Sequence, residues 1–194
     1  MARLGLFAYG SLVSPDSAAR TLGRVVEASP PLRLSGWRRR WSTMRDNHAC
    51  EKTFARRSDG SLPGHVLGLN LEPSGDPDEA PNGVLLELRA EELERLDVRE
   101  LRYDRFALGE GIERPGHLEE VYSYRAKPAH HAPQPPGDTI VIASYASFVE
   151  SAFEALGAGQ RELFLATTGA PPVEVADADL VTDRAIPKGN PREW

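Results

Sequence analysis

The residues with the clearest chemical potential form a turn near the start of the chain, Tyr9-Gly10-Ser11-Leu12. An apolar run before this turn predicts a strand, and a well-marked helix start follows it at Ser14. Such a turn can direct its backbone N–H groups outward, and Gly10 lets the main chain come close to a ligand. The turn is therefore a candidate receptor for a carboxylate or for a developing oxyanion.

A second candidate, Glu100, lies at the predicted exit of a short helix. The spacing of Leu93 and Leu96 predicts that helix, and strand-like sequence begins again at Tyr103. A carboxylate at such a junction can turn inward to a cavity and exchange protons with a substrate. A lone glutamate at a helix end is more often a surface charge, so the hypothesis depends on pairing Glu100 with the turn.

Other uses of the turn fit the sequence less well. Ser11 lacks the second glycine of the G-x-S-x-G elbow that exposes a nucleophilic serine. The turn also lacks the Gly-Lys-Ser/Thr of a phosphate-binding loop, and the chain contains no G-x-G-x-x-G for a dinucleotide. From the local sequence alone, an ordinary tight turn and a binding loop remain equally compatible.

Metal and thiol chemistry are not favoured. The five histidines do not show metal-ligand spacing with cysteines or an H-E-x-x-H helix. Cys50 is the single cysteine, so it cannot form an intrachain disulfide. Its closeness to His48 is compatible with thiol catalysis, but an isolated cysteine is more often a small core residue. We expect no metal and no cofactor.

Composition indicates one globular domain. The chain has 194 residues, of which 40% are hydrophobic and 27% charged, enough to close a substantial core. We expect this domain over residues 1–169. The Pro, Asp and Gly content of residues 170–194 predicts an extended or partly disordered C-terminal tail.

The net charge of -6 and the pI near 5.4 favour a small-molecule partner over nucleic acid, which needs a basic surface. The sequence has neither an apolar run long enough to cross a membrane nor a secretory leader pattern, so we expect a cytoplasmic protein. The oligomeric state stays open.

One local segment runs against the acidic average. Residues 37–57 contain six arginines and one lysine, beginning with Arg38-Arg39-Arg40 between two tryptophans. We interpret this segment mainly as a solvated strand and hairpin, because local charge runs usually lie on solvated faces. A nucleic-acid contact through Arg38 to Arg40 is the weaker reading.

The remaining patterns predict a strand meander followed by helices. Ser14, Pro15 and Gly23 mark the ends of the first helix. After a strand over residues 138–144, a capping box of Ser147 and Glu150 predicts the start of a helix, and a shorter helix follows over residues 160–168.

Three segments together resemble the gamma-glutamylcyclotransferase superfamily. They are the Phe7-Ala8-Tyr9-Gly10-Ser11-Leu12 turn, Gly83-Val84-Leu85 before a short helix, and Leu96-Asp97-Val98-Arg99-Glu100 followed by Tyr103. The resemblance runs from about Leu4 to Leu108, and residues 140–168 resemble a bacterial branch of the group. It implies an α+β fold, a small mixed β-barrel with peripheral helices, whose cavity opens where the turn faces a glutamate.

The resemblance also implies a site and a reaction. Tyr9, Gly10, Ser11 and Leu12 would hold a γ-glutamyl group, Glu100 would be the acid and base, and Tyr103 would be a neighbour by its spacing. The reaction would cyclise a γ-glutamyl amide to 5-oxoproline and release an amine or amino acid, as in glutathione metabolism. The alternative is a non-catalytic small-molecule-binding or regulatory module that retains the cavity.

This chain departs from the family pattern at one place. Only Leu101-Arg102 separates Glu100 from Tyr103, where many members carry a longer insertion with glycine. We therefore expect a different pocket rim. Family resemblance does not choose among γ-glutamyl amino acids, γ-glutamylamines, glutathione and a γ-glutamyl protecting group.

Overall fold

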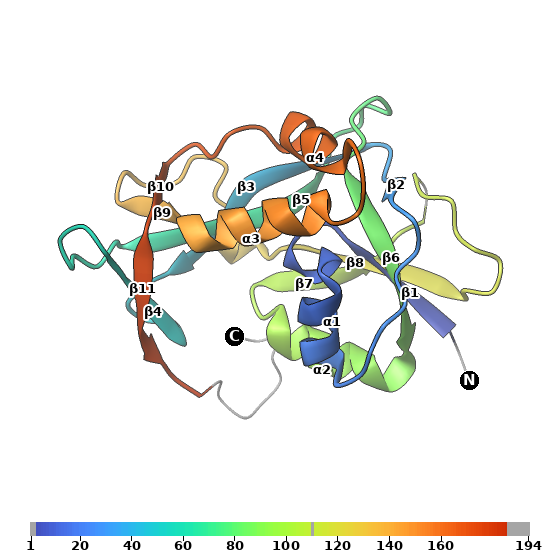
Figure 1. The fold of residues 1–194 in the computed structure, drawn as a ribbon, viewed down its shortest axis with the longest axis horizontal. Coiled ribbons are helices and arrows are strands. Elements are labelled where there is room, and N and C mark those ends of the chain that lie inside the picture. The colour runs from blue at the N-terminus through green and yellow to red at the C-terminus, as the bar shows by residue number, and fades with distance from the viewer. Residues whose placement is uncertain (1–2, 110, 186–194) are drawn as a thin grey trace.

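A computed structural model describes residues 3–109 and 111–185 of the chain (Figure 1). The strands are β1 (Arg3–Ala8), β2 (Leu32–Arg33), β3 (Trp37–Asp46), β4 (Lys52–Arg56), β5 (His65–Pro73), β6 (Asn82–Arg89), β7 (Tyr103–Ala107), β8 (Glu120–Ala126), β9 (Thr139–Ile142), β10 (Glu174–Ala176) and β11 (Ala178–Asp183). The helices are α1 (Pro15–Leu22), α2 (Leu93–Arg99), α3 (Ala143–Glu154), α4 (Gln160–Thr168) and the 3₁₀ helices η1 (Ser11–Val13), η2 (Ala90–Glu92) and η3 (Pro128–His130). The predicted α+β class is confirmed.

The described strands form three sheets with mixed directions. The largest has the order β2-β6-β1-β8-β7, the second β10-β9-β5-β3, and β4 pairs with β11 in a two-stranded ribbon. Strand β1 runs antiparallel to β6 and parallel to β8. The two larger sheets meet through β5 and β8, where the Ala126 N–H donates to Asn70 Oδ1 across 2.7 Å. One hydrophobic core is shared by both sheets and the helices.

Helix α1 begins and ends where its sequence predicts. Ser14 is the N-cap and accepts a hydrogen bond from the Ser17 N–H, and Pro15 occupies the first turn. Gly23 ends the helix in the left-handed conformation with φ 73°, which glycine adopts without strain. This fixed helix start follows η1 directly, so the turn at residues 9–12 is held between β1 and α1.

The helices cover the sheets in two pairs (Figure 1). Helices α1 and α2 pack against each other, and α3 packs against α4. Helix α3 also contacts η1, so a helix from the last third of the chain reaches the N-terminal turn. None of the helices within residues 3–109 and 111–185 is long and apolar enough to cross a membrane.

The start of α3 differs from the prediction. The helix begins at Ala143, with Ile142 as its N-cap, rather than at the capping box of Ser147 and Glu150. The buried strand β9 runs straight into the helix without a polar cap, so the stronger local signal one turn later was misleading. As a result, Tyr145 lies in the first turn of α3.

Residues 170–185 of the predicted tail contain two strands. Strand β10 runs parallel to β9, and β11 runs antiparallel to β4. Residues 186–194 lie outside the described residues. The division of the chain at residue 169 stays a prediction.

Candidate active site

A cavity of about 480 Å³ opens between β3, β5, the α2–β7 connection and the first turn of α3. Its inner end continues into a small pocket of about 50 Å³ that is lined by the turn at residues 8–12. Four residues line both spaces and mark their junction: Ser11, Glu100, Tyr103 and Tyr145. The structure thus brings the predicted turn and the predicted glutamate to one cavity. They are far apart in sequence: Arg99, next to Glu100, is hydrogen-bonded to Ser11 across a sequence separation of 88 residues.

The turn presents backbone N–H groups rather than reactive side chains. Gly10 precedes η1, whose hydrogen bonds begin with Val13 N–H to Gly10 O at 3.0 Å. The N–H groups of Ser11 and Leu12 come before these bonds and have no acceptor among the described residues, as the geometry of a helix start requires. The Tyr9 hydroxyl donates to the Tyr124 carbonyl at 2.8 Å, so this side chain anchors the turn in the core.

Glu100 lies at the end of α2, as the sequence predicts. It is the C-cap of the helix, and the Tyr103 N–H donates to its carbonyl oxygen at 2.9 Å, which turns the chain into β7. Its side chain is 18% exposed and faces the cavity. Burial raises the pKa of the Glu100 carboxyl, and the neighbouring Arg99 guanidinium partly opposes this shift.

Arg99 joins the glutamate to the turn. Its Nε donates to Glu100 Oε1 at 3.1 Å, and its Nη2 donates to Ser11 Oγ at 2.9 Å. The same guanidinium reaches helix α1, with hydrogen bonds to Ser17 Oγ at 3.0 Å and Thr21 Oγ1 at 2.5 Å. Ser11 therefore accepts a hydrogen bond from a cation, and no general base among the described residues is hydrogen-bonded to its hydroxyl, which argues against its use as a nucleophile.

Two tyrosines close the junction from the other side. The Tyr103 hydroxyl donates to the Leu69 carbonyl at 2.7 Å, and burial raises the pKa of this phenol well above its ordinary value. Tyr145 comes from α3, and its ring packs edge-on against Trp41 with centroids 6.1 Å apart. Burial also raises the pKa of Tyr145, so both phenols stay neutral donors at neutral pH.

The segment that carries Glu100 is fixed by a second acidic residue. Asp97 accepts from the Tyr124 hydroxyl at 2.8 Å and from Arg105 at 2.9 Å. Tyr124 is the residue whose carbonyl holds Tyr9. The end of α2 and the N-terminal turn are thus attached to the same point of β8.

Gly83 has a steric reason to be glycine. A Cβ atom at this position would lie 2.3 Å from the Ala8 carbonyl oxygen and 2.7 Å from the Phe7 ring. Backbone cannot yield to such a contact, so β6 can approach the end of β1 only with glycine here. This packing fixes the strand end from which the turn begins.

Arg39 corrects the interpretation of the arginine-rich strand. Arg39 is completely buried, whereas the sequence pattern indicated a solvated segment. Its guanidinium lies against the stacked rings of Phe153 and Phe164 and donates to Asn82 and to the Tyr9 carbonyl, the latter at 3.2 Å. Burial lowers its pKa to about 9, so it remains charged at neutral pH. Arg39 therefore supports the turn from behind.

The predicted site residues Tyr9, Gly10, Ser11, Leu12, Glu100 and Tyr103 all line the cavity or its inner pocket. Arg99 and Tyr145 also line the cavity and were not predicted from the sequence. Tyr145 was hidden by the wrong helix start. Arg99 stood next to Glu100 in the motif, but its partners in α1 are about 80 residues away and no local pattern indicates them. The part of the chain that the structure describes contains no group of three His, Cys, Asp or Glu side chains arranged to hold a metal ion.

Comparison with known proteins identifies the fold. No protein-family model and no curated sequence matches the chain. A solved structure described as a gamma-glutamyl cyclotransferase is similar with a TM-score of 0.58 and 15% identity, covering 90% of this chain and 94% of that one. An uncharacterized human protein of known crystal structure is similar with a TM-score of 0.54 and 16% identity, covering 88% and 90%. The chain therefore has the gamma-glutamyl cyclotransferase-like fold.

Proposed function

We propose that this protein is an enzyme that cyclises a γ-glutamyl amide to 5-oxoproline and releases an amine or amino acid. The observation that carries the proposal is the position of Glu100, a largely buried carboxylate with a raised pKa, in the cavity that the Tyr9–Leu12 turn lines. A carboxylate with these properties suits proton exchange near neutral pH. The likeness of the fold to a gamma-glutamyl cyclotransferase supports the same reaction class.

The reaction needs no nucleophile from the enzyme. The substrate's own α-amine attacks its γ-carbonyl carbon, and the carbonyl electron pair moves to oxygen. Collapse of this tetrahedral species breaks the bond from the γ-carbon to the leaving nitrogen and closes the five-membered ring. The amine must lose a proton and the leaving nitrogen must gain one, so no water is consumed and the atoms balance.

Glu100 is the residue we assign to both proton transfers. As a carboxylate it accepts a proton from the attacking amine, and as an acid it returns a proton to the leaving nitrogen. Arg99 holds one carboxylate oxygen at 3.1 Å, which leaves the other oxygen for the substrate. Without Arg99, burial alone would favour the protonated form more strongly, and less of the base would be present.

The turn has the complementary role. The N–H groups of Ser11 and Leu12 can donate to the developing oxyanion, while the narrow inner pocket keeps the glutamyl chain folded on itself. The Tyr103 hydroxyl already donates to Leu69, so we assign this residue to the wall of the pocket.

A turnover panel tests the proposal. The protein is incubated with γ-glutamyl dipeptides, γ-glutamylamines and glutathione, and 5-oxoproline is measured. We expect release of 5-oxoproline from at least one class. Stabilisation of the protein by these compounds in a thermal shift, with no product from any of them, would instead identify a non-catalytic binding module.

A further inference from the structure

The residues that line the large cavity have a net positive charge. Six charged residues line the cavity, four of them cations and two of them carboxylates: Arg45, Lys52, Arg99 and Arg102 against Glu51 and Glu100. The difference is two positive charges, in a protein whose net charge is -6. Such a local reversal of sign indicates where an anion is bound.

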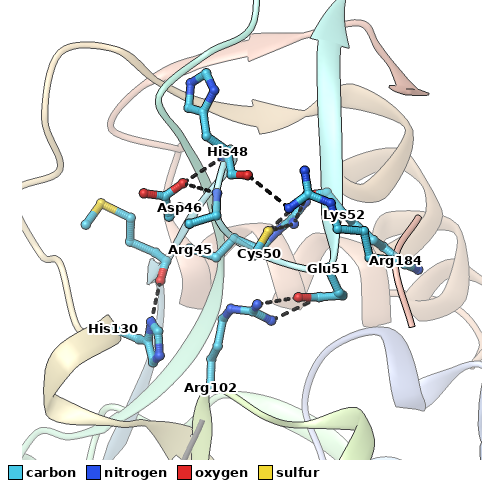
Figure 2. A network of polar contacts seen from close by, with 11 residues as sticks. Arg45, Asp46, His48, Cys50, Glu51, Lys52, Arg102, His130 and Arg184 are labelled. Carbon is cyan, nitrogen blue, oxygen red and sulfur yellow. Dashed lines mark hydrogen bonds and ion pairs between the residues drawn. The ribbon is translucent and has the colours of Figure 1, made fainter. Parts of the chain in front are cut away.

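Both carboxylates already have a partner. Glu100 pairs with Arg99 at the inner junction, and Glu51 pairs with Arg102 through two hydrogen bonds, which Figure 2 shows. Burial opposes the ionisation of Glu51, but Arg102 and, more weakly, the nearby Arg45 charge hold its pKa below the ordinary value, so the Glu51–Arg102 pair is ionised at neutral pH. The surplus charge is therefore that of Arg45 and Lys52.

Neither surplus cation has a carboxylate within ion-pair distance among residues 3–109 and 111–185. Arg45 donates to the Cys50 sulfur at 2.9 Å and to the Lys52 carbonyl at 2.7 Å, and its guanidinium stacks over the Phe54 ring. These contacts hold the side chain at the cavity wall but do not neutralise it. Lys52 lines the cavity and is exposed to solvent.

The two cations lie away from the inner pocket. Arg45 and Lys52 line the large cavity, whereas the pocket beside the turn does not include them. Along the sheet, Thr43 pairs with Gly68 close to Tyr103, and Arg45 pairs with Val66 two residues further out. Two strand residues span about 7 Å, so the backbone of Arg45 lies about 7 Å further along β3 than that of Thr43.

This separation matches the length of a short leaving group. If the γ-glutamyl part occupies the inner pocket, the bond that breaks lies near Glu100, and the leaving group extends toward Val66 and Arg45. One or two amino-acid residues reach up to about 7 Å from the breaking bond. A carboxylate at the end of such a leaving group would come to the two surplus cations.

Resting on the proposed function, we infer that Arg45 and Lys52 form an anion subsite that selects γ-glutamyl substrates whose leaving group ends in a free carboxylate. Substrates that release an amine without a carboxylate would leave both cations without a partner. The neutral Glu51–Arg102 pair forms the neighbouring wall and does not contribute to the selection.

Two peptides that differ only in charge test the inference: γ-glutamyl-alanyl-glycine and its C-terminal amide. We expect kcat/KM to be about tenfold higher for the acid, the preference that corresponds to about 1.4 kcal/mol. In K52Q the acid should lose most of this advantage while the amide stays within about twofold of wild type, because the substitution removes only the charge. R40Q removes an exposed arginine of β3, the strand that carries Arg45, and is the control for loss of a surface cation.

A binding measurement tests the proposed anion subsite independently of turnover. Calorimetric titration of E100Q with both peptides should show about tenfold tighter binding of the acid, and K52Q in the same background should remove most of the difference. Equal binding of acid and amide would overturn the inference. An equal loss for both peptides in K52Q would overturn it as well, because Lys52 would then contact the glutamyl carboxylate. Absence of 5-oxoproline from wild-type protein, with acid-selective binding retained, would contradict only the proposed function.

Discussion

The Nε atom of Arg99 lies 3.1 Å from Oε1 of its sequence neighbour Glu100. The ionised guanidinium stabilises the ionised carboxylate, and burial opposes it, so the pKa of Glu100 is raised less than burial alone would raise it. Because Arg99 is also bound to Ser11 and to helix α1, the direction of the carboxylate is fixed by the same contacts that fix the turn. The predictions below depend on this relationship.

Replacing Arg99 should change the pH dependence of turnover. In R99Q the opposing charge is lost, the pKa of Glu100 rises further, and the ionised base appears only at higher pH. The acidic limb of the kcat/KM profile should therefore move to higher pH, and R99K should move it less. R20Q, which removes an exposed arginine of α1, should leave the limb in place. An unshifted profile in R99Q would show that Arg99 does not influence the ionisation of Glu100.

The ionised Glu100 carboxylate should reduce the stability of the folded protein at neutral pH. A raised folded-state pKa means that folding favours the protonated form, so stability falls as pH rises from the ordinary value of 4.5 through the raised value. E100Q removes the buried charge and should raise Tm at neutral pH by roughly 2 to 4 °C. The gain should disappear below pH 4.5. E94Q, on the exposed side of α2, should give no such pH-dependent difference.

The N-terminal turn and Glu100 were found from sequence because their signals are local. A strand, a glycine turn and a capped helix follow one another within about 20 residues, and the glutamate ends a short amphipathic helix. Arg39 was misjudged because its neighbours in sequence are arginines, whereas its burial depends on aromatic rings from α3 and α4 more than 100 residues later. Tyr145 was missed because the apolar strand β9 continues directly into α3 and gives no start signal.

Arg39 should contribute strongly to stability although no carboxylate within residues 3–109 and 111–185 forms an ion pair with it. R39M leaves the Asn82 and Tyr9 carbonyls and the Thr168 hydroxyl without their donor, which should reduce the free energy of unfolding by about 3 kcal/mol or more. R40M, at the exposed next position, should change it by less than about 0.5 kcal/mol. Chemical denaturation measures both. Equal stability of the two variants would show that the buried hydrogen bonds contribute little.

Gly83 should tolerate no side chain. In G83A the new methyl group meets the Ala8 carbonyl oxygen, so β1 and β6 must separate at the point where the turn begins. We expect a loss of about 1 to 3 kcal/mol in unfolding free energy, together with reduced turnover because the turn shifts. G137A is the control, since its Cβ would meet no atom within 4 Å. A G83A protein as stable and active as wild type would contradict the packing argument.

Glu100 has the central role in the proposed mechanism, as both acid and base. The decisive measurement is 5-oxoproline release by wild type and E100Q, side by side, from a γ-glutamyl peptide that wild type consumes. We predict that E100Q retains the fold and binds the peptide but loses turnover by at least about 100-fold. Full turnover in E100Q would contradict the assignment of proton transfer to Glu100, and with it the mechanism proposed for this cavity.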